Sequence, residues 1–145
     1  MKIIVDIDGT IADCRHRIHL VKDGRKEWKK FFDLMHEDLP IQPVIRLVNA
    51  MFNANSDILY VTGRPEEYRA ATTNWFQDNT VHCNDILMRK TGDFRPDYII
   101  KEEILFQQQG IGFWPDLVID DNQVVVDMWR KHGIITLQNS MRELP

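Results

Sequence analysis

Residues 5–10, with the sequence Val-Asp-Ile-Asp-Gly-Thr, constrain this chain more than any other stretch. They follow a short β-branched run, which predicts a strand over about residues 2–6. Side chains i and i+2 of a strand point to the same side, so Asp6 and Asp8 emerge together where the strand gives way to Gly9. A plain turn is one interpretation, because aspartate and glycine are common turn residues. The other is a site for a hard cation and for chemistry on phosphate.

The composition is that of one globular domain. The chain has 145 residues, of which 43% are hydrophobic and 28% are charged, and we expect a single domain over residues 1–145. A chain of this length buries roughly 70% of the surface that it exposes when unfolded. The net charge of -4 argues against a protein that coats nucleic acid nonspecifically, but it leaves room for a local basic site.

The two cysteines, Cys14 and Cys83, form neither a disulfide framework nor a CxxC motif. This usage predicts a reducing compartment, and the cytoplasm is the expected location. The first apolar run is interrupted by Asp6 and is too short for the core of a signal peptide. Because no apolar run approaches the length of a membrane span, no membrane partner is expected.

Apolar runs alternate with helical patterns along the chain. Each run is nearly continuous, which is typical of parallel strands covered by helices on both faces. After the first strand we expect strands at about 57–61, 86–88, 117–119 and 134–137, and helices at about 27–35, 44–51, 66–77, 98–108 and 124–132. The pattern predicts an α/β fold with a parallel sheet of about five strands, and the charge-rich residues 13–39 are expected to form a small cap insertion after the first strand.

Polar residues follow four of the expected strands, where each strand ends. They are Asp6 and Asp8, Thr62 and Arg64, Arg89, and Asp120 and Asp121. Ligands of open parallel sheets bind outside the carboxyl ends of the strands, so these groups would meet in one crevice. Each group also has a simpler explanation: residues 62–63 and 120–122 could cap helices, and residues 101–103 could be a solvated helix face. Four such coincidences at one edge of a sheet favour a functional site.

Four sequence features follow one another along the chain: residues 6–10 (Asp-Ile-Asp-Gly-Thr) and 61–64 (Val-Thr-Gly-Arg) at strand ends, Lys101 in the helix expected at about 98–108, and residues 119–121 (Ile-Asp-Asp) at another strand end. In this order and context they resemble the four motifs of the haloacid dehalogenase (HAD) superfamily, over nearly the whole chain. The first motif is highly specific, and the other three gain weight from their order. The resemblance implies a Rossmann-like HAD fold.

A narrower resemblance covers two segments. Residues 89–104 (Arg-Lys-Thr-Gly-Asp-Phe-Arg-Pro-Asp-Tyr-Ile-Ile-Lys-Glu-Glu-Ile) and 119–130 (Ile-Asp-Asp-Asn-Gln-Val-Val-Val-Asp-Met-Trp-Arg) are similar to the 3′-phosphatase domain of phage polynucleotide kinase–phosphatase. The sequence contains no GxxxxGK[ST] motif and leaves no room for a kinase domain. We therefore expect a stand-alone phosphatase relative, whose substrate does not carry over directly.

The superfamily resemblance implies four catalytic residues. Asp6 would be the nucleophile that forms an aspartyl-phosphate, and Asp8 would protonate the leaving alcohol and then activate water. Thr62 would donate its hydroxyl to a phosphoryl oxygen, and Lys101 would pair with the nucleophile and the phosphoryl charge. Positioning and charge neutralisation should supply most of the catalysis.

Mg²⁺ is the implied cofactor. It would lie among the Asp6 carboxylate, the Asp8 backbone carbonyl, one or both of Asp120 and Asp121, and waters. Because Mg²⁺ takes oxygen ligands and usually keeps several waters, few carboxylates suffice.

Substrate binding is expected from residues near the motifs, namely Gly9, Thr10, Arg17, Gly63, Arg64 and Arg89. Arg64 and Arg89 match arginines of the polynucleotide phosphatase pattern, and arginine can hold phosphate through two hydrogen bonds. Arg17 lies about where that pattern has a further arginine, although Arg15 is a competitor. Pairing with nearby acids at the surface is the alternative for Arg17 and Arg95.

Asp97 is expected in a supporting role. It precedes Lys101 by four residues, which is one helical turn, and could orient the lysine.

Residues 22–30 carry five basic side chains against two acidic ones, a local excess of +3. With Trp28 and Phe32 interleaved, this stretch could form a cleft wall that stacks a base and meets a backbone phosphate. The alternative is an amphipathic helix whose aromatic side chains are buried. We favour burial for Phe31 and leave Trp28 open between the two.

The remaining histidines and tryptophans indicate structural roles. His16 and His19 lie three residues apart without an evident third ligand, so a zinc site is not expected. Trp75, Trp114 and Trp129 lie in apolar patterns and are expected in the core.

Together these features predict a Mg²⁺-dependent phosphomonoesterase that removes 3′-phosphate from nucleic acid ends or nucleotides. The small insertion leaves the site open, which suits a polymer end or a nucleotide. A nucleotidase that acts on free 5′- or 3′-mononucleotides is the alternative enzyme, and the net charge of -4 favours it mildly. A HAD-fold binding module without activity is a third candidate, disfavoured because every expected catalytic position is filled.

Overall fold

The computed structural model describes residues 1–141 and contains a five-stranded sheet in which all neighbouring strands are parallel. The order is β5-β4-β1-β6-β7, with β1 at Lys2–Val5, β4 at Asp57–Pro65, β5 at Asp85–Arg89, β6 at Leu117–Asp120 and β7 at Ile135–Gln138. β1 is central, with Val5 beside Tyr60 of β4 and Ile119 of β6. The predicted α/β fold with about five parallel strands is confirmed.

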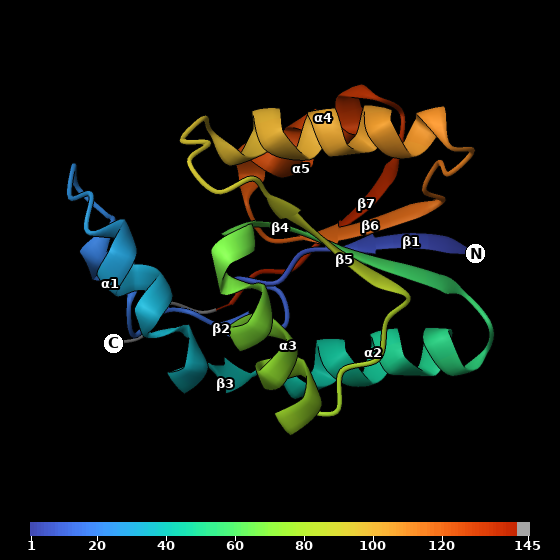
Figure 1. The fold of residues 1–145 in the computed structure, drawn as a ribbon. Coiled ribbons are helices and arrows are strands. Elements are labelled where there is room, and N and C mark those ends of the chain that lie inside the picture. The colour runs from blue at the N-terminus through green and yellow to red at the C-terminus, as the bar shows by residue number, and fades with distance from the viewer. Residues whose placement is uncertain (142–145) are drawn as a thin grey trace.

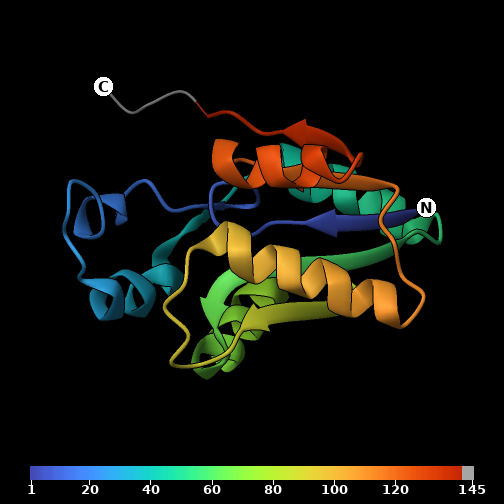
Figure 2. The same cartoon turned by 90° about the horizontal axis from the view of Figure 1, so that it is seen from above.

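Helices cover both faces of the sheet, as Figure 1 and Figure 2 show. The covering helices are α2 (Gln42–Asn53) and α3 (Arg69–Asp78) on one face, and α4 (Asp97–Gly110) and α5 (Gln123–Lys131) on the other. The side chains of β1 alternate accordingly: Ile3 and Val5 are buried with residues of α2 and α3, whereas Ile4 is buried with residues of α4 and α5. The period of two along the central strand thus builds two cores.

β4 is longer than the strand expected at residues 57–61. It continues to Pro65, which has extended φ and ψ of -66° and 150° and lies beside Arg89 of β5 after a register shift. The short 3-10 turn η3 (Glu66–Tyr68) then leads into α3. The proline therefore ends a strand, and the helix expected from residue 66 begins with a 3-10 turn.

The insertion expected over residues 13–39 lies between two short strands. β2 (Ala12–Asp13) and β3 (Leu39–Pro40) form an antiparallel ribbon, so the chain leaves the core and returns to it at adjacent points. The segments between them are η1 (Ile18–Leu20), α1 (Trp28–Asp33) and η2 (Met35–Glu37). Figure 1 shows the insertion beyond the carboxyl ends of the strands, which is the edge where the motif residues lie.

Two of the three tryptophans expected in the core are buried. Trp75 and Trp129 have exposed fractions of 4% and 0%. The expectation for Trp114 is wrong: this residue is 36% exposed because it lies in the loop between α4 and β6, outside the helix layers, where its ring meets the edge of His132. Among residues 1–141, no helix combines the length and the apolar character that crossing a bilayer requires.

Candidate active site

A tight turn after β1 gathers the first motif. The amide of Asp6 donates to the carbonyl of Ile119 in β6, and the carbonyl of Ile7 accepts from three amides that follow it. Gly9 has a φ of +84°, which glycine adopts without steric cost. This turn returns the hydroxyl of Thr10 to Asp6, where it donates to Oδ2 at 2.9 Å.

Lys101 of α4 is buried between two carboxylates. Its Nζ donates to Asp6 Oδ1 at 2.7 Å and to Asp120 Oδ2 at 2.8 Å. Burial by itself would lower the pKa of Lys101, but the charges of Asp120 and Asp6 outweigh it and raise the pKa. The lysine is therefore a charged partner of Asp6 and not part of a solvated helix face.

Asp6, Asp120 and Asp121 form a carboxylate cluster, with one oxygen of each within 4.8 Å of the others. Asn122 caps α5 by accepting from two backbone amides, which leaves both preceding aspartates for the cluster. Burial and the charge of Asp120 raise the pKa of Asp121 to about 6. Burial, with the charges of both neighbours, also raises the pKa of Asp6 despite the opposing effect of Lys101.

The carboxylate cluster fits a divalent cation such as Mg²⁺. Ionised carboxylates this close repel each other, and a bound cation would remove the repulsion and favour the ionised forms. The turn is shaped around the cluster, because a Cβ at Gly9 would lie 2.0 Å from Asp121 Oδ2. Asp6, Asp120 and Asp121 supply the oxygen ligands that this ion prefers. The Asp8 carbonyl stays a predicted fourth ligand.

Two arginines hold the side chain of Asp8. Arg64 donates to its Oδ2 and Oδ1 at 3.1 and 2.7 Å, and Arg17 donates to its Oδ1 at 2.6 Å. Both arginine side chains are fully buried. Burial opposes the charge of Asp8, but Arg64 and Arg17 outweigh it and hold the pKa of this carboxyl well below its usual range. The two predicted arginines thus converge on the predicted acid and base.

Asp38 belongs to the same network, although it lies outside the four sequence motifs. Its buried carboxylate accepts from Arg17 at 2.8 and 2.6 Å and from Arg64 at 3.4 Å, and His16 Nε2 lies 2.7 Å from it. Its backbone carbonyl accepts from the indole of Trp75 at 2.9 Å. No local pattern marks Asp38, because only the return of the insertion brings it beside an arginine 21 residues earlier.

Two other arginines near the motifs pair with acids at or near the surface. Arg15 donates to Asp13 at 2.6 Å. Arg95 donates to Asp93 at 2.7 Å and also pairs with Glu103. Arg95 therefore follows the alternative of a surface ion pair.

Thr62 and Gly63 lie at the end of β4. Thr62 is fully buried, and its hydroxyl oxygen accepts from the amide of Arg64 at 3.1 Å, so its hydrogen can still be donated. A Cβ at Gly63 would lie 2.4 Å from Asp97 Oδ1. The glycine therefore permits a close approach between this strand end and the start of α4.

The guanidinium of Arg89 is engaged within the protein. It donates to the carbonyls of Gly63, Asp93 and Arg95 and to the carboxylate of Asp97. These contacts fix the loop before α4 against the end of β4. Phosphate binding by Arg89 stays a prediction, and the contacts observed are those of a scaffold residue.

Asp97 acts on Lys101 through charge. Its carboxylate accepts from Arg89, while the side-chain hydrogen bonds of Lys101 within residues 1–141 go to Asp6 and Asp120. The negative charge of Asp97 nevertheless contributes to the raised pKa of Lys101. Direct orientation of the lysine by Asp97 stays a prediction.

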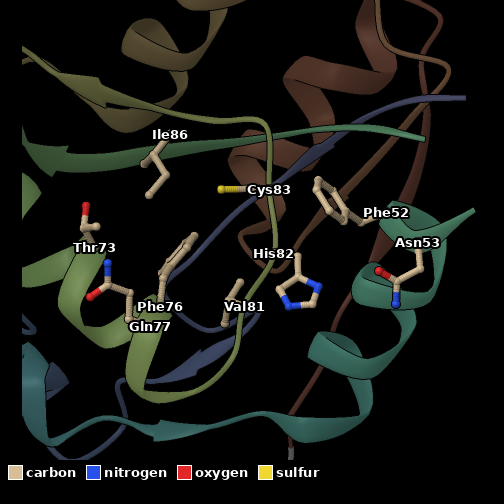
Figure 3. Close-up of a pocket in the computed structure, with 9 residues that line it drawn as sticks. All are labelled: Phe52, Asn53, Thr73, Phe76, Gln77, Val81, His82, Cys83 and Ile86. Carbon is tan, nitrogen blue, oxygen red and sulfur yellow. The ribbon is translucent and has the colours of Figure 1, made fainter. Parts of the chain in front are cut away.

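A hollow of about 420 Å³ lies apart from these residues. Figure 3 shows its lining, which comes from the end of α2, from α3, from the segment that leads into β5 and from Ile86 of β5. The lining is mostly apolar, includes Phe52, Phe76 and Cys83, and contains none of the predicted site residues. The candidate active site is therefore the carboxyl edge of the sheet.

The contacts of Asp6 restrict the reactions that this edge can support. One carboxylate oxygen of Asp6 accepts from a charged lysine and the other from a hydroxyl, and two further carboxylates lie beside it. On a parallel α/β sheet of this order, such an arrangement fits the phosphatases of the HAD superfamily that the sequence motifs resemble. Residues 1–143 match the phosphatase domain of polynucleotide kinase PNKP, and the chain belongs to that family.

Solved structures agree with this assignment. The chain is similar to one in the structure of the Pnkp1/Rnl/Hen1 RNA repair complex, with a TM-score of 0.79 and 26% identity over 95% of this chain and 42% of that one. In another Pnkp1/Rnl/Hen1 structure the values are 0.79 and 28%, over 99% and 47%. The chain thus spans less than half the length of either. The class C acid phosphatase from Bacillus anthracis shares the fold, with a TM-score of 0.66 and 18% identity over 94% and 64%.

Proposed function

We propose that this chain is a Mg²⁺-dependent phosphomonoesterase that works through an aspartyl-phosphate and removes 3′-phosphate from nucleic acid ends or nucleotides. The observation that carries the proposal is the placement of Asp6, 2.7 Å from Lys101 and 2.9 Å from Thr10, within the carboxylate cluster. Membership of the PNKP phosphatase domain family supports a polynucleotide substrate. The similarity to a chain of an RNA repair complex supports it further.

In the first step, a carboxylate oxygen of Asp6 attacks phosphorus in line with the leaving 3′-oxygen. The new bond joins Asp6 to phosphorus while the bond to the 3′-oxygen breaks, and Asp8 supplies the proton that this oxygen takes. Lys101 and the Thr62 hydroxyl offset the charge on the phosphoryl oxygens. A bound Mg²⁺ would reduce the repulsion between the Asp6 carboxylate and the anionic substrate.

In the second step, water attacks phosphorus and gives a proton to Asp8. The bond between phosphorus and Asp6 breaks, which releases inorganic phosphate and restores the free carboxylate. The same side chain thus alternates between acid and base. The double role is favoured because Asp6 and Asp8 both follow β1, so their side chains emerge on the same side of the chain.

The test is phosphate release from a panel of substrates with Mg²⁺ and with EDTA. A 3′-phosphorylated oligonucleotide should be hydrolysed with Mg²⁺ and not with EDTA. Absence of release from the oligonucleotide and from every mononucleotide would refute the function. Binding of Mg²⁺ is measured separately as a rise in melting temperature, which Asp121→Asn should reduce because it removes one negative charge from the carboxylate cluster.

A nucleotidase for free 5′- or 3′-mononucleotides is the second candidate. The net charge of -4 favours it, because a long polymer contact needs a broad basic surface. Faster turnover of mononucleotides than of the oligonucleotide would decide for it. An inactive binding module is disfavoured by the filled positions Asp6, Asp8 and Lys101.

The free thiols of Cys14 and Cys83 support the expected reducing, cytoplasmic setting.

A further inference from the structure

The insertion exposes a tryptophan on an aromatic cluster. Trp28, the first residue of α1, is 46% exposed, whereas Phe31 is 6% exposed, which confirms its predicted burial. Trp28 is stacked with Phe32 at 6.0 Å between ring centres and meets the edge of Phe31 at 5.6 Å. Phe32 in turn contacts the ring of Tyr68 at 5.1 Å. The indole therefore packs against Phe31 and Phe32, while the rest of the ring is open to solvent.

This cluster connects directly to the candidate active site. The guanidinium carbon of Arg17 lies 4.1 Å from the ring centre of Phe31, and Arg17 also donates to the Phe31 carbonyl at 3.1 Å. The same arginine donates to Asp8 at 2.6 Å. A chain of two side chains, Phe31 and Arg17, therefore links the exposed Trp28 to the predicted acid and base.

Tyr68 fastens α1 to the rest of the edge. Its hydroxyl donates to Asp33 of α1 at 3.3 Å, and the amide of the preceding Glu67 donates to the hydroxyl of Thr91 at 3.1 Å. Thr91 lies in the loop between β5 and α4, which Figure 1 places at the same edge as the insertion. Three segments distant in sequence thus form one continuous border of the site.

The basic side chains of residues 22–30 divide into paired and unpaired ones. Lys29 pairs with Asp33 at 2.6 Å, and Lys30 pairs with Glu27 at 3.1 Å. The other three are exposed and form no ion pair with any residue in the described range 1–141: Lys22, Arg25 and Lys26. These unpaired positive charges lie within six residues of Trp28 along the chain and contrast with the net charge of -4 of the whole chain.

We propose that Trp28, Lys22, Arg25 and Lys26 form a strand-binding surface for the single-stranded nucleotides that precede the terminal 3′-phosphate. A base would stack on the open face of Trp28, and the three cations would meet backbone phosphates. Charge complementarity favours an anionic partner over an apolar one, and the exposed ring favours a single strand among anions, because single strands are bound without sequence preference by aromatic rings together with cations. The inference rests on the proposed function and adds the part of the substrate beyond its phosphate.

The test compares kcat/KM for a 3′-phosphorylated single strand of about ten nucleotides with kcat/KM for p-nitrophenyl phosphate. Trp28→Ala should lower the ratio of the two by about tenfold, the effect expected from loss of one stacked base, and Trp28→Phe should restore most of it. Trp114→Ala is the matched control, since it removes another exposed tryptophan in the loop before β6, and it should leave the ratio unchanged.

The charges are tested by the triple variant Lys22→Ala/Arg25→Ala/Lys26→Ala. Its binding of the single strand should show a slope of log K against log salt that is smaller by about 2, because three phosphate contacts are lost. Arg46→Ala on α2 controls for the loss of an exposed cation elsewhere and should leave the slope unchanged. Circular dichroism and melting temperature verify that every variant is folded.

An unchanged ratio in Trp28→Ala, or an unchanged salt slope in the triple variant, would overturn the strand-binding surface in favour of a protein partner. The proposed function would survive that result, since the wild type and the variants would still release phosphate. If the wild type instead released no phosphate from any 3′-phosphate, the proposed function would fail. Binding of the oligonucleotide to Asp6→Asn, with and without Trp28→Ala, would then decide the strand-binding surface alone.

Discussion

Arg17 and Asp38 lie at the two ends of the insertion, 21 residues apart, and two hydrogen bonds of 2.8 and 2.6 Å join them. Arg17 also donates to Asp8 at 2.6 Å. Asp38 therefore fixes the arginine that fixes the predicted acid and base. One buried ion pair thus links the closure of the insertion to the position of Asp8, beside the pairing of β2 with β3 and the hydrogen bonds from Arg64.

Asp38→Ala should destabilise the protein and lower its activity together. The substitution leaves the buried guanidinium of Arg17 without its main partner, which costs about 3–5 kcal/mol. Unfolding in urea measures the loss, and phosphate release measures the activity. Glu103→Ala is the control, because it breaks an exposed pair with Arg95 and should cost less than about 1 kcal/mol. Equal losses in the two variants would contradict the role given to Asp38.

Asp6→Asn should abolish turnover while the protein stays folded. The amide cannot form the aspartyl-phosphate, so kcat should fall on the order of 10⁴-fold or more. Steady-state release of phosphate measures the loss, and circular dichroism verifies the fold. Asp127→Asn on the exposed face of α5 should retain full activity. Full activity in Asp6→Asn would show that another residue attacks phosphorus.

Gly9→Ala should be worse than Gly92→Ala, although both glycines have nearly the same φ, +84° and +85°. The positive φ costs about 1–2 kcal/mol for alanine at either position. Only at Gly9 would the new Cβ lie 2.0 Å from a side chain, that of Asp121, whereas nothing lies within 4 Å at Gly92. We expect a further loss of about 1–3 kcal/mol for Gly9→Ala, and loss of activity as Asp121 is displaced. Similar stability and activity in the two variants would rule out this steric explanation.

The pH dependence should report Asp8. Burial opposes its charge, but Arg64 and Arg17 hold the pKa of Asp8 well below its usual range, so little of its acid form exists at neutral pH. The acid form increases as pH falls, and only alkyl leaving groups need its proton. The ratio of turnover for a 3′-nucleotide to that for p-nitrophenyl phosphate should therefore rise from about pH 8 to about pH 5.

Arg64→Gln should shift this rise to higher pH, because it removes the arginine that lowers the pKa of Asp8 more than Arg17 does. Arg95→Gln, which changes an exposed arginine away from Asp8, should leave the profile in place. A ratio that does not change with pH in the wild type would exclude Asp8 as the proton donor.

The positions of Asp6, Asp8, Lys101 and Asp120 were predictable because parallel strands place their carboxyl ends at one edge. Each of these residues follows an apolar strand or lies near the start of a helix, so local patterns suffice to bring them together. The scaffold contacts of Arg89 were not predictable, since its partners include backbone carbonyls whose directions depend on the loop between β5 and α4.

Asp38 and Trp114 show the other limit of sequence patterns. Asp38 lies in a segment whose return path is set by the pairing of β2 with β3, and no periodicity encodes that pairing. Trp114 has apolar neighbours in sequence, yet it lies in a loop where they do not enclose it. Proximity along the chain predicts burial inside strands and helices better than inside loops and insertions.

The insertion has a base, formed by the ribbon of β2 and β3 with Arg17 and Asp38, and a tip that could be replaced. Ala12 faces Pro40 and Asp13 faces Leu39, so the two ends are separated by one strand spacing, about 5 Å. A different hairpin grafted above this ribbon would leave the sheet undisturbed, provided that Arg17 and Asp38 at its base were kept. The tip that bears Trp28 is thus a part that evolution or an engineer can exchange, and substrate preference can diverge while the hydrolytic machinery stays the same.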